Sequence, residues 1–318
     1  MELLSVQLRA IRYEAEGVNS FELRPVGAKE LPPFSAGAHI DIQIFPGLVR
    51  SYSLCNSQDE RHRYVIGVNH DRNSRGGSRH MHESLRVGQM LSIGTPRNNF
   101  PLDERAGHSV LVAGGIGITP LLGMVRRLQS TGRSWELYYC ARSHPCAAFL
   151  DVIRRLKGDS PRGMLHLRFD DRAPGLLDLA GVVDAAAEGS HFYCCGPLPM
   201  LAAFEAATGA VPAERVHLEY FSAKEEPSKA GGFAVELAQS GLTVQVAEGQ
   251  TILDALLEAG VDVPYSCMQG ICASCETRVL EGVPDHRDLV LTKDEQASNT
   301  VMMVCCSGSK SPRLVLDR

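Results

Sequence analysis

The 318-residue sequence predicts a multidomain protein with an antiparallel β-barrel, an α/β domain built on a parallel sheet, and a small C-terminal α+β domain. Three observations lead to this prediction. Short apolar segments fill the first hundred residues, strands then alternate with helices, and a polar stretch separates a third, acidic part. At roughly 100–200 residues per domain, two or three domains are expected. The predicted domains are 1–103, 104–222 and 233–318, with a linker at 223–232.

The first domain contains short apolar segments separated by turns with proline and glycine, at the spacing typical of a barrel. We expect its strands at Val6–Ile11, Ser20–Leu23, His39–Ile44, Ser51–Leu54, Tyr64–Val68 and Met90–Ile93.

The pattern changes at Ser109, where strands begin to alternate with helices. The strands are expected at Val110–Ala113, Glu136–Cys140, Leu165–Phe169 and His191–Cys194, and the helices from Pro120 through Leu128 and around Ala147–Leu156. Such alternation predicts a parallel sheet with helices on both faces.

The stretch Ala223–Gly232 has no apolar periodicity and contains proline, serine and glycine, which predicts a linker. After it we expect a hairpin of Phe233–Leu237 with Leu242–Val246, and a helix over Thr251–Ala259. Residues 233–318 hold 12 Asp and Glu against 6 Lys and Arg, a net charge of −6, so residues 1–232 carry +1. The acidic charge either steers a redox partner or only solvates the surface.

Composition excludes several classes of protein. With 44% hydrophobic and 22% charged residues, the chain is typical of a folded globular protein. With a net charge of −5, the chain lacks the excess of basic residues that is typical of nucleic-acid-binding proteins. The apolar run Val110–Val125 is too short and too rich in glycine for a membrane span, and the N-terminal residues lack a signal-peptide pattern. We expect a soluble cytoplasmic protein that binds neither nucleic acid nor membrane.

The ten cysteines are clustered, which favours metal or redox chemistry in a reducing compartment over a disulfide framework. Cys267, Cys272 and Cys275 form a C-x4-C-x2-C pattern, and Cys305 follows after 29 intervening residues. This spacing is typical of a plant-type [2Fe–2S] cluster. A structural zinc site is the alternative, although zinc sites usually pair shorter C-x2–4-C knuckles.

The loop between these cysteines contains the small residues Gly270, Ala273 and Ser274, which let backbone N–H groups approach the sulfur atoms. The fourth ligand is either Cys305 or its neighbour Cys306, and we favour Cys305, with Cys306 as a small buried apolar residue.

A second motif lies in the barrel domain. Arg50-Ser51-Tyr52-Ser53-Leu54 is on a predicted strand, and Arg75-Gly76-Gly77-Ser78-Arg79-His80 precedes a helix. The N–H groups of such a turn, together with Arg50, favour a phosphate. Tyr52 can lie against a flat ring and Ser53 can hydrogen-bond to it. The alternative is that these segments are an ordinary strand and an ordinary turn with no role in ligand binding.

A third motif lies in the α/β domain. Gly114–Pro120 follows a buried strand and precedes a helix, and its glycines permit close approach of a pyrophosphate. Cys195-Gly196-Pro197 ends another strand, so Cys195 is either at the ligand-binding edge of the sheet or a buried core residue. Asp170 and Asp171 end a further strand and can accept hydrogen bonds from ribose hydroxyls, although such a pair is also common in loops.

In order and spacing, these motifs resemble the phthalate dioxygenase reductase and vanillate demethylase reductase family over essentially the whole chain. The resemblance implies an FMN-binding barrel, an NAD(H)-binding α/β domain and a C-terminal plant-type ferredoxin domain of the β-grasp fold. The matching segments are Arg50–Leu54 (R-x-Y-S), Gly76–Ser78 (G-G-S), Pro96–Leu102 (P-R-N-x-F-P-L), Gly114–Pro120 (G-G-I-G-I-T-P), Cys195–Pro197 (C-G-P) and Glu219–Phe221. One departure is Met268, where the family more often has a charged residue.

The resemblance also implies roles for individual residues. Arg50 and Gly77–Ser78 would surround the FMN phosphate, Tyr52 would lie on the isoalloxazine, and Thr119 would lie near the ring. Phe221 would cover the nicotinamide side. The expected catalytic residues are Ser53, near flavin N5, and Cys195, near nicotinamide C4. The full set of expected cofactor-binding residues is Arg50, Ser51, Tyr52, Ser53, Val68, Asn69, Gly76, Gly77, Ser78, Gly114, Gly115, Gly117, Thr119, Pro120, Arg142, Ser143, Asp170, Asp171, Cys195, Gly196, Pro197 and Phe221.

The expected function is electron transfer from NADH through FMN and the [2Fe–2S] cluster to a separate terminal oxygenase of the Rieske non-haem iron type. The oxygenase would be an aromatic-ring dioxygenase or a demethylating monooxygenase. Asp170 and Asp171 favour NADH, whereas Arg142-Ser143 could bind the 2′-phosphate of NADPH. We expect a monomer. The alternatives are an electron-transfer subunit of another flavoenzyme, which the long gap before Cys305 disfavours, and a non-catalytic iron–sulfur sensor.

Overall fold

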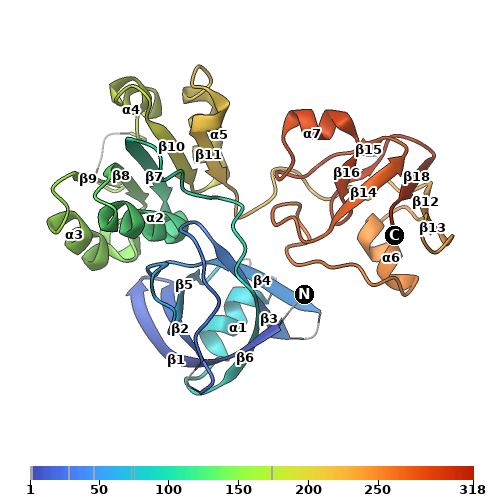
Figure 1. Cartoon of the computed structure of the whole chain (residues 1–318), viewed down its shortest axis with the longest axis horizontal. Helices are drawn as coiled ribbons and strands as arrows, with labels where there is room; N and C mark the ends of the chain where they lie inside the picture. The colour runs from blue at the N-terminus through green and yellow to red at the C-terminus, as the bar shows by residue number, and fades with distance from the viewer. Residues whose placement is uncertain (1–2, 28, 46, 73, 75, 173–174) are drawn as a thin grey trace. The chain divides into compact units, whose positions relative to one another are not determined.

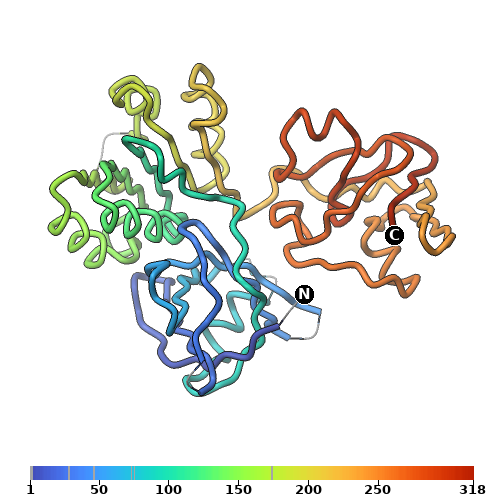
Figure 2. The backbone as a smooth tube through the Cα atoms, in the orientation of Figure 1, coloured from blue at the N-terminus to red at the C-terminus, as the bar shows by residue number. Residues whose placement is uncertain are grey.

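The structure is a computed structural model that describes all residues except 1–2, 28, 46, 73, 75 and 173–174. It contains two compact units, Met1–Phe221 and Ser222–Arg318. The path of the backbone through each unit is drawn in Figures 1 and 2.

The first part of the first unit is an antiparallel six-stranded sheet in the order β4-β3-β6-β1-β2-β5. A bridge between Leu54 and Ile66 joins its two outer strands, which closes the sheet into a barrel. The helix α1 (Gly77–Glu83) contributes Met81 to the barrel core. The predicted barrel is confirmed, with strands β1 (Leu3–Ala15), β2 (Val18–Pro25), β3 (His39–Phe45), β4 (Leu48–Ser53), β5 (Tyr64–Asn69) and β6 (Met90–Gly94).

The second part of the first unit is a parallel sheet in the order β11-β10-β7-β8-β9. Helices α2 (Ile118–Ser130) and α3 (Leu150–Gly158) pack on one face, and α4 (Leu179–Ala185) and α5 (Leu198–Ala207) on the other. The predicted architecture is therefore confirmed. Its strands are β7 (His108–Gly114), β8 (Ser134–Ala141), β9 (Gly163–Phe169), β10 (His191–Cys195) and β11 (Val216–Glu219).

Helix α3 begins later than the sequence predicts. Ala147 and Ala148 are buried but precede the helix, and Phe149 adopts a left-handed conformation with φ of 62°. The aromatic ring of Phe149 packs close to Gly67 of β5, where an added Cβ would lie 2.9 Å from the ring. The apolar pattern of this segment thus reflects burial against the barrel as well as a helix face.

The second unit has a mixed five-stranded sheet in the order β13-β12-β18-β14-β16 and a separate pair, β15 with β17. The predicted hairpin is confirmed as β12 paired with β13, and Thr251 caps α6 through a capping box with Asp254. The elements are β12 (Phe233–Leu237), β13 (Thr243–Val246), α6 (Ile252–Glu258), β14 (Glu276–Glu281), β15 (Pro284–Asp285), α7 (Lys293–Ser298), β16 (Val301–Met303), β17 (Gly308–Ser309) and β18 (Arg313–Leu316).

Part of the predicted linker is fixed to the second unit by hydrogen bonds. The amide N of Ser228 donates to the carbonyl of Cys306 at 2.7 Å, and Arg287 donates to the carbonyl of Glu226 at 3.4 Å. The carbonyl of Lys229 accepts from Gly249 N at 2.9 Å. Four residues, 222–225, therefore separate Phe221 from the first of these attachments.

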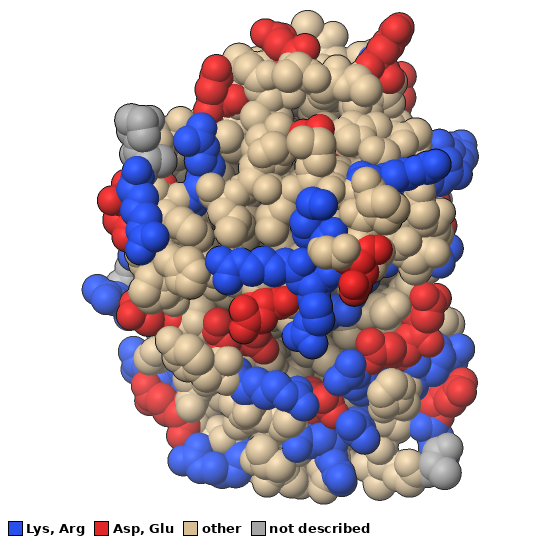
Figure 3. All heavy atoms as spheres, turned by 90° about the vertical axis from the view of Figure 1, so that its left-hand side faces the viewer, with Lys and Arg blue, Asp and Glu red and all other residues tan. Residues whose placement is uncertain are grey.

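Charged side chains of both signs are interspersed on the face shown in Figure 3. A separate cluster lies in the barrel, where the nearly inaccessible carboxylate of Glu22 contacts Arg12 at 3.2 Å, Arg24 at 2.7 Å and Arg63 at 3.0 Å. Within the part of the chain that the structure describes, no helix is long and apolar enough to cross a membrane.

Candidate active site and cluster loop

Two of the predicted nucleotide segments are in contact at the carboxyl edge of the parallel sheet. Strands β7 and β10 are paired in parallel, with Cys195 beside Ala113. A Cβ at Gly117 would lie 2.1 Å from the carbonyl oxygen of Cys195, and a Cβ at Gly196 would lie 3.1 Å from the Cα of Gly114. Only glycine permits such close backbone packing. Gly115 lies in a short 3-10 helix, Gly115–Gly117, that leads into α2, and Pro120 lies in the first turn of α2. Pro197 packs on Gly114.

Asp170 and Asp171, predicted to bind ribose, and Arg142-Ser143, the alternative site for a 2′-phosphate, lie in two neighbouring loops at the same edge. Asp170 N donates to the carbonyl of Ala141, and Asp171 N donates to the carbonyl of Arg142, both at 3.1 Å. Ser143, next to Arg142, donates through its hydroxyl to the Sγ of Cys146 at 3.2 Å. The acidic pair and the arginine are therefore adjacent, as binding of one nucleotide by both loops requires.

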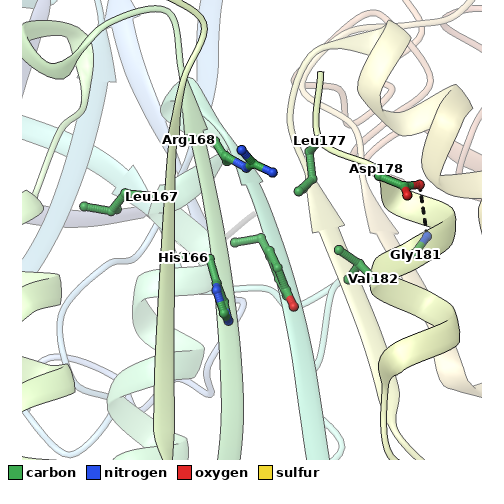
Figure 4. A pocket seen from close by; sticks show the side chains of 8 residues that line it. His166, Leu167, Arg168, Leu177, Asp178, Gly181 and Val182 are labelled. Atoms are coloured by element: carbon green, nitrogen blue, oxygen red, sulfur yellow. Dashed lines mark hydrogen bonds between the residues drawn. The ribbon is translucent and has the colours of Figure 1, made fainter. Parts of the chain in front are cut away.

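A cavity of about 420 Å³ opens farther along the sheet, between β8, β9 and the start of α4 (Figure 4). The rings of Tyr138 and His166 stack there with centroids 4.3 Å apart, and Arg168 lies above them. Asp178 accepts from Gly181 N at 3.0 Å and so caps α4. The residues predicted to bind the nucleotide do not line this cavity.

The predicted phosphate-binding residues come together on the barrel. A Cβ at Gly77 would lie 2.7 Å from Cγ and 3.0 Å from Nε of Arg50, so the arginine side chain packs on the first turn of α1. Gly76 has φ of 98°, which favours glycine, and Ser78 Oγ accepts from Asp71 N at 3.2 Å. Arg75, which precedes this turn, lies outside the described residues.

The Arg-Ser-Tyr-Ser strand, β4, runs beside β3. Burial raises the pKa of Tyr52 to about 12, so its phenol stays neutral, and Ser53 is buried. The hydroxyl of Ser51 donates to Asp41 at 2.6 Å, and Asp41 also accepts from Arg97 at 2.6 Å. Ser51 and the arginine of the Pro-Arg-Asn segment thus share one buried carboxylate, which joins that segment to the strand.

Thr119 lies between the barrel and the parallel sheet. A Cβ at Gly67 of β5 would lie 2.7 Å from the Cγ2 of Thr119. Val68 and Asn69 follow Gly67 on the same strand; Val68 is buried and its carbonyl contacts Nε2 of His82 at 2.9 Å. These residues therefore lie where the two sheets of the first unit meet.

One partly buried acid at this edge was not among the predicted site residues. Glu219 ends β11 in register with Cys195, and its Oε2 is enclosed without a hydrogen-bond partner among the described residues. Burial raises the pKa of Glu219 to about 8, and burial also raises the pKa of Cys195. An acidic residue at a strand end, directly before Tyr220 and Phe221, was the available signal. Phe221 itself is 40% exposed.

The four candidate cluster ligands converge in the second unit. Hydrogen bonding with Cys272, and then with Cys305, lowers the pKa of Cys267 to about 2, and hydrogen bonding with Cys305 lowers that of Cys275. The same contacts raise the pKa values of Cys272 and Cys305, because the thiols share protons. Such a set of mutually contacting thiols from two segments fits an iron–sulfur cluster.

Backbone N–H groups are aimed at these sulfur atoms. Gln269 N and Ile271 N donate to the Sγ of Cys267 at 3.3 and 3.5 Å, and the Cys272 thiol donates to Ser274 at 3.2 Å. Left-handed conformations at Met268, Gly270 and Ala273 turn the loop around the thiols. N–H donors of this kind stabilise the reduced cluster, which is more negatively charged, and so raise the reduction potential.

Cys306 occupies a different position from Cys305. Its thiol lies 3.7 Å from the carbonyl of Met303, and a Cβ at Gly270 would lie 2.4 Å from its Sγ. Cys306 therefore packs on Gly270 and Met303, whereas Cys305 contacts Cys267 and Cys275 as well as Cys306.

Comparisons with known proteins agree with this arrangement. Residues 111–206 match the family described as "Oxidoreductase NAD-binding domain", and residues 235–309 match "2Fe-2S iron-sulfur cluster binding domain". The chain is 55% identical to phenoxybenzoate dioxygenase subunit beta of Ectopseudomonas oleovorans, over 100% of this chain and 98% of that protein. It is 53% identical to tetrachlorobenzoquinone reductase of Sphingobium chlorophenolicum, over 95% and 94% of the two chains.

The solved structure of phthalate dioxygenase reductase, described as modular for electron transfer from pyridine nucleotides to [2Fe–2S], superposes with a TM-score of 0.76. Its sequence is 39% identical, and the match covers 99% of this chain and 98% of that one. The chain belongs to the phthalate dioxygenase reductase family. Members of this family are reductase components of oxygenase systems, and the predicted oxidoreductase class and its cofactors, FMN, NADH and a [2Fe–2S] cluster, are confirmed.

Proposed function

We propose that this chain reduces the terminal oxygenase of an aromatic-ring dioxygenase system, of the Rieske non-haem iron type, in the cytoplasm and as a monomer. The relative named phenoxybenzoate dioxygenase subunit beta, 55% identical over nearly the full length of both proteins, supports this kind of partner. The observation that carries the proposal is that one chain contains both a glycine-lined nucleotide edge and a set of four thiols from two segments.

We assign residues 1–103 to FMN binding, 104–222 to NADH binding and 233–318 to the cluster, with 223–232 as linker. In the flavin domain, Arg50 with the turn Gly76–Ser78 binds the phosphate, because a guanidinium and free N–H groups both favour an anion. Tyr52 and Ser53 lie against the ring, and Thr119 with Val68–Asn69 contributes where the barrel meets the parallel sheet.

In the NADH domain, Gly117 packs closely on the backbone of Cys195. Because glycine has no side chain, the pyrophosphate can approach the first turn of α2. Asp170 and Asp171 accept hydrogen bonds from the ribose hydroxyls and repel a 2′-phosphate. Cys195 acts by shape rather than as a nucleophile, since burial keeps its thiol protonated. Hydride transfer needs approach and alignment, which a small neutral side chain permits.

Cys267, Cys272, Cys275 and Cys305 are the proposed ligands of the cluster. When bound, flavin converts a two-electron donor into a source of single electrons, and the cluster carries them one at a time. The N–H groups of Gln269 and Ile271 donate to the sulfur of Cys267 and so stabilise the negative charge of its thiolate.

The test is an anaerobic titration of the purified protein with NADH, followed by addition of an oxidised Rieske oxygenase. We expect flavin and cluster absorption that NADH bleaches, and reoxidation on addition of the oxygenase. Reduction of cytochrome c or a benzoquinone without any reoxidation by Rieske oxygenases would overturn the proposed partner. Absence of bleaching with NADH would overturn the assignment of the first two domains.

A further inference from the structure

The segment Asp285–Asp288 begins at the last residue of β15 and alternates between partly exposed and buried side chains. Asp285 and Arg287 pair with each other at 3.1 Å and remain partly exposed. The side chain of His286 is 8% exposed and that of Asp288 is fully buried. None of these residues belongs to the proposed ligand set, so the two buried polar side chains need a separate explanation.

His286 and Asp288 form an isolated pair in the interior of the second unit. Nδ1 of His286 lies 3.6 Å from Oδ1 of Asp288. Among the described residues, neither ring nitrogen nor Oδ1 has a hydrogen-bond partner. The other oxygen, Oδ2, accepts from Val290 N at 3.2 Å and Leu291 N at 2.8 Å. Backbone donors of this kind favour negative charge on a carboxylate, and the imidazole of His286 faces the other oxygen, Oδ1.

Asp288 packs against the cluster loop at Gly270, which lies between Cys267 and Cys272. A Cβ at Gly270 would lie 2.9 Å from the Cα and 3.1 Å from the Cβ of Asp288. The adjacent Leu289 N donates to the carbonyl of Gly270 at 2.9 Å. Asp288 is therefore packed against the stretch of backbone that joins two proposed ligands, and His286 lies beside Asp288.

We infer that His286 and Asp288 are positioning residues that set the reduction potential of the cluster. The inference rests on the proposed ligand set. Reduction adds one electron to the cluster, so a buried negative charge beside its loop opposes reduction and a buried positive charge favours it. Such charges act strongly because the surrounding protein screens them poorly. The pair thus keeps two side chains with opposite effects on the reduction potential 3.6 Å apart.

A purely structural role makes a different prediction. If Asp288 only caps the backbone of Val290 and Leu291, its loss and the loss of His286 would both loosen the loop and move the potential in the same direction. If the charges act, Asp288→Asn raises the potential and His286→Gln lowers it. The double variant His286→Gln with Asp288→Asn then returns toward the wild-type value.

The experiment is a redox titration of the full-length holoprotein, with the reduced cluster followed by EPR. Asp294→Asn is the matched control, because Asp294 is exposed on α7 and the same charge is removed. We expect opposite shifts for the two single variants, each larger than the shift of the control. Shifts of the same sign, or no larger than the control, would overturn the inference.

Cluster content, measured from visible absorption, separates this inference from the proposed function. A wild-type protein that binds no [2Fe–2S] cluster refutes the ligand assignment itself. If Asp288→Asn alone fails to load, His286→Gln decides: a lowered potential supports the inference, and an unchanged or raised potential overturns it.

Discussion

Replacing Gly117 with alanine tests the nucleotide edge directly. The new Cβ would lie 2.1 Å from the carbonyl oxygen of Cys195 and 2.9 Å from the amide nitrogen of Gly196. Both are backbone atoms, so no side-chain rotation relieves the contact, and the turn and the strand end must move apart. Overpacking of this kind destabilises a protein by about 1–3 kcal/mol.

The change in stability is measurable as a melting temperature. In a domain of about 150–250 residues, 1 kcal/mol shifts the midpoint by about 2–4 °C, so a loss of about 3 kcal/mol corresponds to roughly 6–12 °C. The same movement displaces the strand end that carries Cys195, which we propose lies near the nicotinamide. A displacement of about 1 Å can slow a reaction about 100-fold, and we expect flavin reduction by NADH to slow toward that extent.

The assay is thermal unfolding by circular dichroism, combined with stopped-flow absorbance of the flavin after mixing with NADH. Gly107→Ala is the matched control, because an added Cβ at Gly107 meets no atom within 4 Å. If Gly117→Ala melts within about 2 °C of that control and reduces its flavin at the same rate, the argument from close packing at Cys195 is refuted.

The other predictions concern the buried groups and the ligands. Cys195→Ala should slow flavin reduction while FMN and cluster content stay unchanged; unchanged kinetics in stopped flow would remove Cys195 from the catalytic residues. The pKa of Glu219 is raised from 4.5 to about 8, so its contribution to stability is present below pH 4.5 and is lost as pH rises through 8. Between pH 4.5 and about 8, the free energy of unfolding of Glu219→Gln should therefore exceed that of wild type, and the difference should grow by up to about 1.4 kcal/mol per pH unit. Equal pH profiles of melting temperature for the two proteins would contradict this. Cys305→Ala should abolish cluster absorption and Cys306→Ala should retain it; the reverse result would exchange the two assignments.

The sequence was informative where a local pattern decides the structure. The barrel strands and the hairpin of β12 with β13 follow from apolar alternation between turns, and the glycine-rich turn lies at the end of β7 as expected. Helix α7 was missed although Thr292 and Glu295 form a capping box, because the segment is short and polar and has no apolar face.

Other features depend on contacts between distant residues. Glu219 matters because β11 pairs with β10 and brings it beside Cys195, and no local pattern specifies that register. The same holds for Asp288, whose contact with Gly270 joins two loops that only the folded second unit brings together. The preference for Cys305 over Cys306 as the fourth ligand likewise depends on which residues each thiol contacts in the folded unit.

The short stretch between Phe221 and Glu226 has a kinetic consequence. Five consecutive Cα steps span at most roughly 18 Å, so the cluster domain is a tethered partner of the flavin domain and not a diffusing one. Tethers of this length correspond to effective concentrations in the millimolar range. Electron transfer within the chain should therefore be first order, independent of dilution, and resistant to competition by an added free ferredoxin. Only the final transfer to the oxygenase should depend on protein concentration.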